Sequence, residues 1–327
     1  MIGALTAIDE RLDKLITLDI GGRGVEHLYD AARARQGSSL VGAAADALAK
    51  VPAGSTVLIT TGSVSRAWIS PTVGENDGPA GAAVIARALA IARNITPVIV
   101  AEETLLDGLA AMLTSAGLSV LPYERARIAS GDGSLAIAST RSFPTTDDEA
   151  GPAAAQLLDE LEPALLFSTE RAGRAADGVY YSMQALDYGM GRARIDRLFD
   201  EAAHRAIPTV AVGDGGNEIG MGAIADAVRE HVKSGETISA VTSTDVLVTA
   251  ACSNWGCYAI AAALAVRLAD QRLVHTAEQE AALLRRGTDL GLINSVAGVI
   301  DSNVDGIPAA THLALAELVH AVVRTAF

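Results

Sequence analysis

Residues 207–222 read IPTVAVGDGGNEIGMG, an apolar run that leads directly into a glycine-rich stretch. The apolar run lacks the alternation of polar and apolar residues that marks a strand with one face in water. It therefore predicts a strand covered on both faces. Asp214, Asn217 and Glu218 follow at its carboxyl end, on a turn whose glycines let a ligand come close to the backbone.

Four further runs of this kind occur along the chain. They are TVLITTG (56–62), TPVIVAE (96–102), ALLFSTE (164–170) and DVLVTAAC (245–252). Ala-rich segments with helical spacing separate several of them, and the segment 256–270 is apolar almost all round, which predicts a buried helix. This alternation is typical of an α/β fold with a mainly parallel, doubly wound sheet and helices on both faces.

The change from helical spacing to alternating strands and helices near residue 50 predicts the domain organisation. Residues 1–50 have helical spacing, interrupted by GGRG at 21–24, and we expect them to form a helical N-terminal segment packed on the core. Residues 51–327 are expected to form essentially one α/β domain, with the loop 141–152 as a candidate boundary between two lobes. The segment 127–140 predicts a β-hairpin around Gly131–Gly133.

Composition excludes several classes of protein. The net charge of −14 and the absence of a run of basic residues argue against a nucleic acid partner. No apolar stretch reaches the length of a membrane span, and no signal peptide is visible, so we expect a cytoplasmic protein with a small-molecule substrate. Whether the protein forms a homo-oligomer stays open. Cys252 and Cys257 are expected to be small core residues.

Nucleotide and pyridoxal cofactors are not expected. The chain has no GxxxxGK[ST] motif, and its match to the dinucleotide fingerprint is only formal, so neither ATP nor NAD is expected. The three lysines, Lys14, Lys50 and Lys233, lie outside the expected strand-end loops, which argues against pyridoxal phosphate (PLP).

In open α/β sheets, ligands bind at the loops that follow the strands. Those loops bring together acidic and cationic residues: Glu75, Asp77, Glu170, Asp177, Asp214 and Glu218, with Arg66, Arg171 and Arg174. Carboxylates with an amide suit a hard divalent cation such as Mg²⁺ or Mn²⁺, and arginines suit a substrate carboxylate. Simpler interpretations stay open, since Asp77 and Asn217 could cap helices and the arginines could be surface charges.

At these loops the chain resembles the D-glutamate cyclase family. The resembling segments are LITTG (58–62), GENDGPAGA (74–82), ERAGRAADGVYYSM (170–183), GDGGNEIGMG (213–222), SNWGCYA (253–259), VDGIP (304–308) and TH (311–312). Cys257 departs from the family segment, which has a second glycine there. The resemblance implies a related fold over most of the chain and the intramolecular dehydration of D-glutamate, an acidic amino acid, to 5-oxo-D-proline.

The resemblance and the residue chemistry together give the site expectations. Catalysis is expected from Asp214, Glu170 and Glu218. Substrate binding is expected from Arg171, Arg174, Asn217, Asn254, Arg66, Gly215 and Gly216. A divalent metal is expected on Glu75, Asp77, Asp177, Asp214 and Glu218. Two rival functions remain: a metal-dependent hydrolase or phosphatase, and a non-catalytic binding protein for an acidic amino acid.

Overall fold

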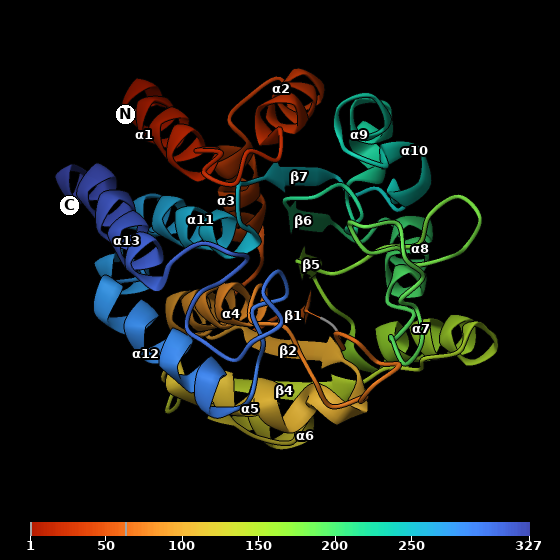
Figure 1. Cartoon of the computed structure of the whole chain (residues 1–327). Coiled ribbons are helices and arrows are strands. Elements are labelled where there is room, and N and C mark those ends of the chain that lie inside the picture. The colour runs from red at the N-terminus through yellow and green to blue at the C-terminus, as the bar shows by residue number, and fades with distance from the viewer. Residues whose placement is uncertain (1, 63) are drawn as a thin grey trace.

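The computed structural model describes residues 2–62 and 64–327, and these residues contain a seven-stranded sheet (Figure 1). The strands are β1 (Thr56–Thr61), β2 (Thr96–Ala101), β3 (Ser119–Val120), β4 (Ile137–Ser142), β5 (Leu165–Thr169), β6 (Thr209–Gly213) and β7 (Val246–Thr249). Their order is β3-β4-β2-β1-β5-β6-β7, and every neighbouring pair is parallel. The predicted fold class is confirmed.

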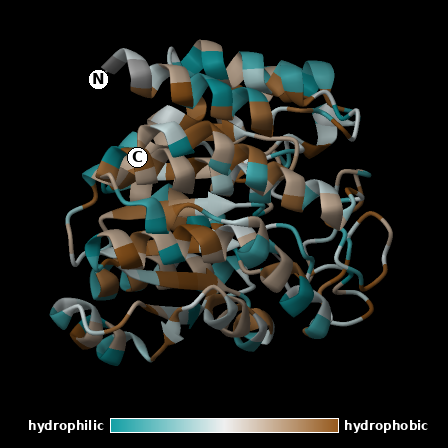
Figure 2. Ribbon diagram, turned by 90° about the vertical axis from the view of Figure 1, so that its left-hand side faces the viewer, coloured by the Kyte–Doolittle hydropathy of each residue, from teal (hydrophilic) through white to brown (hydrophobic). Residues whose placement is uncertain are grey.

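The central strands are buried on both faces, as their uninterrupted apolar sequences require. In β1, Val57 and Ile59 pack into the hydrophobic cluster on one face, whereas Leu58 packs into the cluster on the other. This alternation follows from the two-residue period of a strand. Figure 2 shows the consequence, with hydrophobic residues concentrated in the interior.

Helices cover both faces of the sheet (Figure 1). One layer contains α1 (Ile2–Ile16), α3 (Leu40–Lys50), α4 (Pro79–Arg93), α5 (Leu106–Ser115), α11 (Ser253–Leu268), α12 (Ala277–Asp289) and α13 (Ala309–Val323). The other contains α6 (Tyr123–Asp132), α7 (Asp147–Leu161) and α8 (Asp196–His204), and α2 (Val25–Gln36), α9 (Ala225–His231) and α10 (Gly235–Ile238) lie near β7. Short 3₁₀ helices are η1 (Glu103–Leu105), η2 (Gly222–Ile224), η3 (Gln271–Leu273) and η4 (Arg324–Ala326). Among the described residues, no helix has both the length and the hydrophobicity needed to cross a bilayer.

Helix α11 is the buried helix that the sequence predicts. Residues 253–265 are all buried, and the helix packs against α3, α4 and the sheet. It approaches β6 so closely that a Cβ atom at Gly256 would lie 2.5 Å from a methyl carbon of Val212. Glycine at this position therefore lets the N-terminal turn of α11 reach the carboxyl ends of the strands.

The predicted hairpin at 127–140 is wrong. Residues up to Asp132 belong to α6, and Gly133, with φ of 67°, ends that helix in the left-handed conformation instead of turning a hairpin. The chain then enters β4, which pairs in parallel with both β2 and β3. A parallel pair needs a crossover connection, so Gly133 serves as a helix cap, while Gly131 lies within α6.

The N-terminal helices pack on α11 and contact each other through a buried carboxylate. Asp13 of α1 accepts hydrogen bonds from the backbone N–H groups of Leu40 (3.1 Å) and Val41 (2.9 Å), the first residues of α3. The backbone N–H of Ala251, just after β7, donates to the carbonyl of Ile16 at 2.7 Å, so the loop between α1 and α2 begins beside the end of β7. The division of the chain into a helical segment, one domain and two lobes stays a prediction.

The strand order locates the place where a ligand is expected. From β1 the sheet continues to β2 on one side and to β5 on the other, so the connections leave β1 and β5 in opposite directions. Such a switch point opens a crevice at the carboxyl ends of the two strands.

Candidate active site

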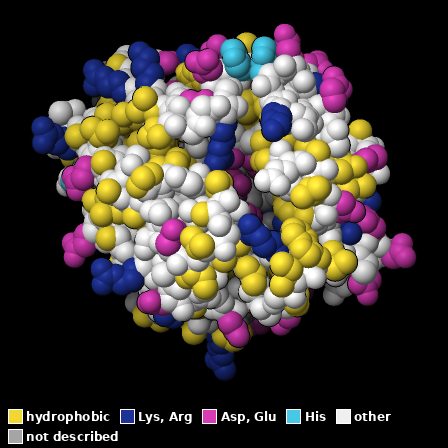
Figure 3. Space-filling model, viewed as in Figure 1, with side chains coloured by type: hydrophobic (Ala, Val, Ile, Leu, Met, Phe, Trp, Pro, Cys, Tyr) yellow, Lys and Arg dark blue, Asp and Glu magenta, His cyan; other side chains and the backbone are white. Residues whose placement is uncertain are grey.

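A cavity of about 730 Å³ opens at the carboxyl ends of β1, β5 and β6. Its walls come from segments far apart in the chain: the strand-end loops, the loop before α2, the end of α9 and the segment 295–305. Figure 3 shows a hollow with acidic side chains in its floor and with lysine or arginine side chains beside it.

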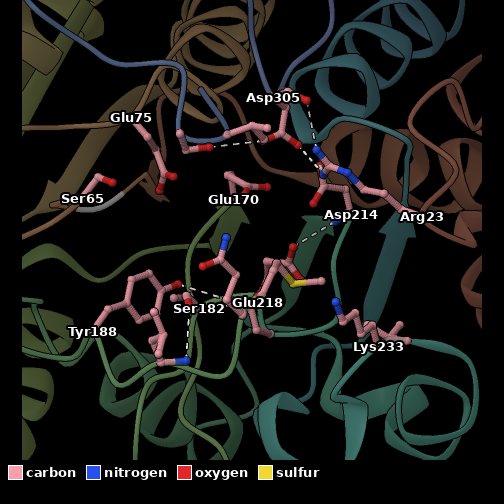
Figure 4. Close-up of a pocket in the computed structure, with 18 of the residues that line it drawn as sticks. Arg23, Ser65, Glu75, Glu170, Ser182, Tyr188, Asp214, Glu218, Lys233 and Asp305 are labelled. Carbon is pink, nitrogen blue, oxygen red and sulfur yellow. Dashed lines mark hydrogen bonds and ion pairs between the residues drawn. The ribbon is translucent and has the colours of Figure 1, made fainter. Parts of the chain in front are cut away.

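Glu170 occupies the centre of the cavity floor (Figure 4). It follows β5 and has φ of 50°, a left-handed conformation that is unfavourable for a residue with a side chain. Its carboxylate accepts a hydrogen bond of 2.5 Å from the Ser253 hydroxyl at the start of α11. Burial, and then the negative charges of Asp77 and Glu218, raise the pKa of Glu170 well above its usual range.

The glycine-rich turn after β6 is organised around Glu218. Its carboxylate accepts hydrogen bonds from the backbone N–H groups of Asp214 (3.2 Å), Gly215 (2.7 Å) and Gly216 (2.7 Å). Gly216 has φ of 106°, so a side chain there would be strained. The two predicted glycines therefore direct their amides to Glu218, and the turn presents the Asp214 side chain to the cavity.

Asp214 is buried and lies next to a cation. Its carboxylate is 3.2 Å from a guanidinium nitrogen of Arg23, which comes from the loop before α2. Burial and the negative charges of Glu170 and Asp305 raise the pKa of Asp214 well above its usual range, against the opposing charge of Arg23. Glu170 and Asp214 are thus two neighbouring carboxyl groups that both bind protons more tightly than ordinary carboxyl groups.

Asp305 lines the cavity, whereas Asp77 is buried next to it and does not line it. We call the five carboxylates of Asp77, Glu170, Asp214, Glu218 and Asp305 the acidic floor. Asp305 has φ of 58°, and Arg23 contacts its carboxylate and donates to its backbone carbonyl at 3.0 Å. Asp77 lies before α4 and accepts hydrogen bonds from the backbone of Gly78 (2.8 Å) and Asn254 (3.1 Å). Burial and the charge of Asp305 raise the pKa of Asp77 to about 7.

Two groups of these acids have the spacing of metal ligands. The groups are Asp77, Asp214 and Asp305, and Glu170, Asp214 and Glu218. In each group, one carboxylate oxygen per residue lies within 4.8 Å of the others. Oxygen donors alone suit Mg²⁺ or Mn²⁺. Among the described ion pairs, Arg23 is the cation that contacts these acids. Because the carboxylates outnumber it, the acidic floor favours a further positive charge, such as a metal ion, a substrate ammonium group or bound protons.

The structure brings several other predicted residues to the cavity. Arg66, Glu75 and Asn217 line it. Arg66 donates to the backbone carbonyl of Ser295 at 3.1 Å, and the Asn217 amide donates to the hydroxyl of Tyr188 at 3.2 Å. These three predicted residues therefore lie where a bound substrate would contact them.

Arg171 and Arg174, which the sequence assigns to substrate binding, lie outside the cavity. Arg171 is 1% exposed and donates to both carboxylate oxygens of Glu102, at 2.7 and 2.9 Å. Arg174 pairs with Asp200 at 3.0 Å and lies 3.6 Å from Asp196. Both guanidinium groups are thus engaged by carboxylates of the protein, and their role in substrate binding stays a prediction.

Asp177 and Asn254 also do not line the cavity. Asp177 is exposed and accepts a hydrogen bond from Tyr181 at 2.7 Å, so it cannot join the metal groups described above. Asn254 is fully buried, and its side-chain oxygen accepts from the backbone N–H groups of Gly78 and Gly81. It joins α11 to the start of α4 and so positions Asp77 from behind.

Sequence reasoning missed many residues that line the cavity, among them Arg23, Tyr188, Lys233 and Asp305. The sequence contained a signal for two of them, because Asp305 belongs to the family-like segment VDGIP and Arg23 belongs to GGRG, which interrupts the helical spacing of residues 1–50. Lys233 follows α9 and not a strand, so a search of the loops that follow strands does not reach it. Burial in the site raises the pKa of Tyr188 to about 12.

Two comparisons show which known proteins the chain is similar to. The sequence model of the family described as "D-glutamate cyclase-like, C-terminal" matches residues 12–319. A human (Homo sapiens) protein named "D-glutamate cyclase, mitochondrial" is 30% identical over 263 residues, which cover 77% of the chain. The same alignment covers 38% of the human protein, so the chain matches well under half of that relative's length.

Proposed function

We propose, since the chain belongs to the D-glutamate cyclase-like, C-terminal family, that it converts D-glutamate into 5-oxo-D-proline and water. One observation supports the proposal most strongly. Glu170 and Asp214, two neighbouring carboxyl groups with raised pKa values, face a cavity that also contains the guanidinium of Arg23.

The reaction needs protons to move between two atoms of the same substrate. The α-ammonium group loses two protons, its nitrogen forms a bond to the γ-carboxyl carbon, and one γ-oxygen leaves as water with two protons. A group that accepts protons from the nitrogen and delivers them to the departing oxygen therefore balances the reaction. Carboxyl groups with raised pKa values suit this task.

The described contacts favour a division of roles. Asp214 and Glu170 exchange the protons, because their carboxylate oxygens lie within 4.8 Å of each other. Arg23 is placed to neutralise the substrate γ-carboxylate, which is a poor electrophile while charged. Glu218 is a positioning residue, since its carboxylate is engaged by three backbone N–H groups.

The α-carboxylate is proposed to pair with Arg66 or Lys233. Arg66 and Lys233 line the cavity from separate loops. Holding both ends of the folded substrate favours five-membered ring closure, because an intramolecular reaction gains most from restricting the reactant to one conformer.

A divalent ion is the second part of the proposal. Asp77, Asp214 and Asp305 would hold Mg²⁺ or Mn²⁺, since they offer oxygen atoms at ligand spacing and repel one another in its absence. Such an ion polarises carboxylate oxygens when it is bound.

Metal removal is expected to lower kcat/KM by about tenfold or more, because charge neutralisation in the acidic floor is lost. The measurement is dialysis against a chelator, elemental analysis, and activity before and after Mg²⁺ or Mn²⁺ is restored. Restored metal should also raise the melting temperature of the wild type, and less so that of Asp305→Asn. Full activity in verified metal-free protein would refute the metal and leave Arg23 as the neutralising group.

Two rival functions remain to be separated by experiment. The oxygen-rich ligand groups would also suit a metal-dependent hydrolase or phosphatase, and the same acids and cations could bind an acidic amino acid without turnover. Incubation with D-glutamate and chiral detection of 5-oxoproline tests the cyclase. Release of phosphate or acid from generic esters would favour the hydrolase, and stoichiometric binding without product would favour the binding protein.

A further inference from the structure

The cavity is larger than free glutamate requires. Its volume of about 730 Å³ lies in the upper part of the range of roughly 300–1,000 Å³ that is typical of sites for drug-sized ligands, whereas glutamate has only about ten non-hydrogen atoms. The acidic floor accounts for the inner part of the cavity. The outer part is lined by side chains of a different kind.

Four large hydrophobic side chains at the mouth form what we call the apolar rim: Trp68, Met183, Leu186 and Val296. They are 55%, 37%, 54% and 64% exposed. A group of exposed apolar side chains at a cavity is commonly a ligand or partner surface. Figure 3 shows hydrophobic side chains gathered beside the hollow, and Figure 2 shows hydrophobic segments in the loops at that end of the molecule.

The apolar rim lies against the acidic floor. A Cβ atom at Gly215 would be 2.6 Å from the sulfur of Met183, so Met183 sits directly on the turn that presents Asp214. The loop of Trp68 meets the loop of Val296, because Arg66 donates to the carbonyl of Ser295. A substrate whose glutamyl part lies on the acids can therefore extend into the apolar rim.

Charge also favours a substrate without a free γ-carboxylate. Free glutamate brings two carboxylates to a floor that already holds Asp77, Glu170, Asp214, Glu218 and Asp305. Joining the γ-carboxyl group to an amine removes one of these negative charges. It also supplies a leaving group that can bury an apolar body against the rim.

We propose that the enzyme also cyclises γ-D-glutamyl amides of apolar amines, which places the leaving amine against Trp68, Met183, Leu186 and Val296. This inference rests on the proposed function. The α-nitrogen bonds to the γ-carbonyl carbon and the bond from that carbon to the amine nitrogen breaks. Of the two protons lost by the α-ammonium group, one goes to the departing amine and the other to solvent, and 5-oxo-D-proline is released.

The test uses γ-D-glutamyl-para-nitroanilide with the wild-type protein, in parallel with D-glutamate. We expect release of para-nitroaniline together with 5-oxo-D-proline, above the rate without enzyme. We also expect kcat/KM about tenfold or more above that for D-glutamate, because the aromatic ring is buried against the rim.

Matched variants assign the effect to the apolar rim. Trp68→Ala is expected to lower the ratio of kcat/KM for the anilide to that for D-glutamate by about fivefold or more, through loss of aromatic contact area. Ile69→Ala is the control, since Ile69 is its chain neighbour, is 74% exposed and does not line the cavity. Its ratio should equal that of the wild type.

Turnover of D-glutamate without release of para-nitroaniline would overturn the inference and leave the proposed function intact. Release of para-nitroaniline with D-glutamate as the product would also overturn it, because hydrolysis would then replace cyclisation. Turnover of neither compound would overturn both.

Discussion

Asp214→Asn is expected to lower kcat/KM by at least about a hundredfold, on the order of 3 kcal/mol of transition-state stabilisation, while the protein folds normally. The amide has nearly the same shape as the carboxylate and can keep its place at the end of β6. It cannot exchange protons with Glu170 or hold a divalent ion as a charged ligand. Steady-state kinetics and circular dichroism measure the two properties.

Stability should be retained or increased in this variant. Burial raises the pKa of Asp214, so the folded protein disfavours its charged form, and ionisation costs stability as the pH rises above the unfolded pKa. The neutral amide removes that cost. Asp226→Asn is the control, because Asp226 is fully exposed on α9. A folded Asp214→Asn variant with nearly wild-type kcat/KM would eliminate Asp214 as a proton-exchanging group or metal ligand.

Arg171→Met is expected to destabilise the protein by about 3–5 kcal/mol, because it leaves the buried carboxylate of Glu102 without its ion pair. The charge of Arg171 holds the pKa of Glu102 below its usual value despite burial, which shows that the carboxylate depends on this partner. Denaturant unfolding measures the loss. Arg229→Met, which breaks an exposed pair with Asp226, should cost only about 1 kcal/mol or less.

Arg171→Lys keeps the charge and provides a second variant if Arg171→Met does not fold. It should be destabilised to an intermediate degree, because lysine cannot make the paired hydrogen bonds of a guanidinium group. Wild-type stability in Arg171→Met, combined with a raised KM for substrate, would contradict the structural role and return Arg171 to the substrate site.

The acidic residues that directly follow a strand were predictable from the sequence. Buried parallel strands have continuous apolar sequences, and polar residues that follow them gather at one edge of the sheet. This reasoning found Glu170, Asp214 and Glu218. It could not assign Glu218 to the backbone amides of the turn, because that arrangement depends on the φ angle of Gly216.

The partners of these acids were not predictable in the same way. Arg23 and Asp305 are 282 residues apart in the chain and meet at Asp214 only through the packing of the N-terminal helices on α11. Neither follows a strand. Arg171 was assigned to the substrate because a guanidinium group in a strand-end loop suits a carboxylate, and its buried partner Glu102 could not be identified from a segment so distant in the chain.

Two broader expectations stay predictions. The human relative is named as mitochondrial, and the cytoplasmic location expected for this chain rests on its sequence alone. The oligomeric state is likewise a matter for measurement in solution.

The most direct test of the cyclase is a single incubation with racemic glutamate that carries heavy oxygen in its γ-carboxyl group. We predict that D-glutamate disappears while L-glutamate remains, that 5-oxo-D-proline forms in equal amount, and that it retains one labelled oxygen while the other appears in water. Chiral chromatography with mass spectrometry measures all of these. Equal consumption of both enantiomers, or no 5-oxoproline at high enzyme concentration with Mg²⁺ or Mn²⁺ present, would contradict the assignment.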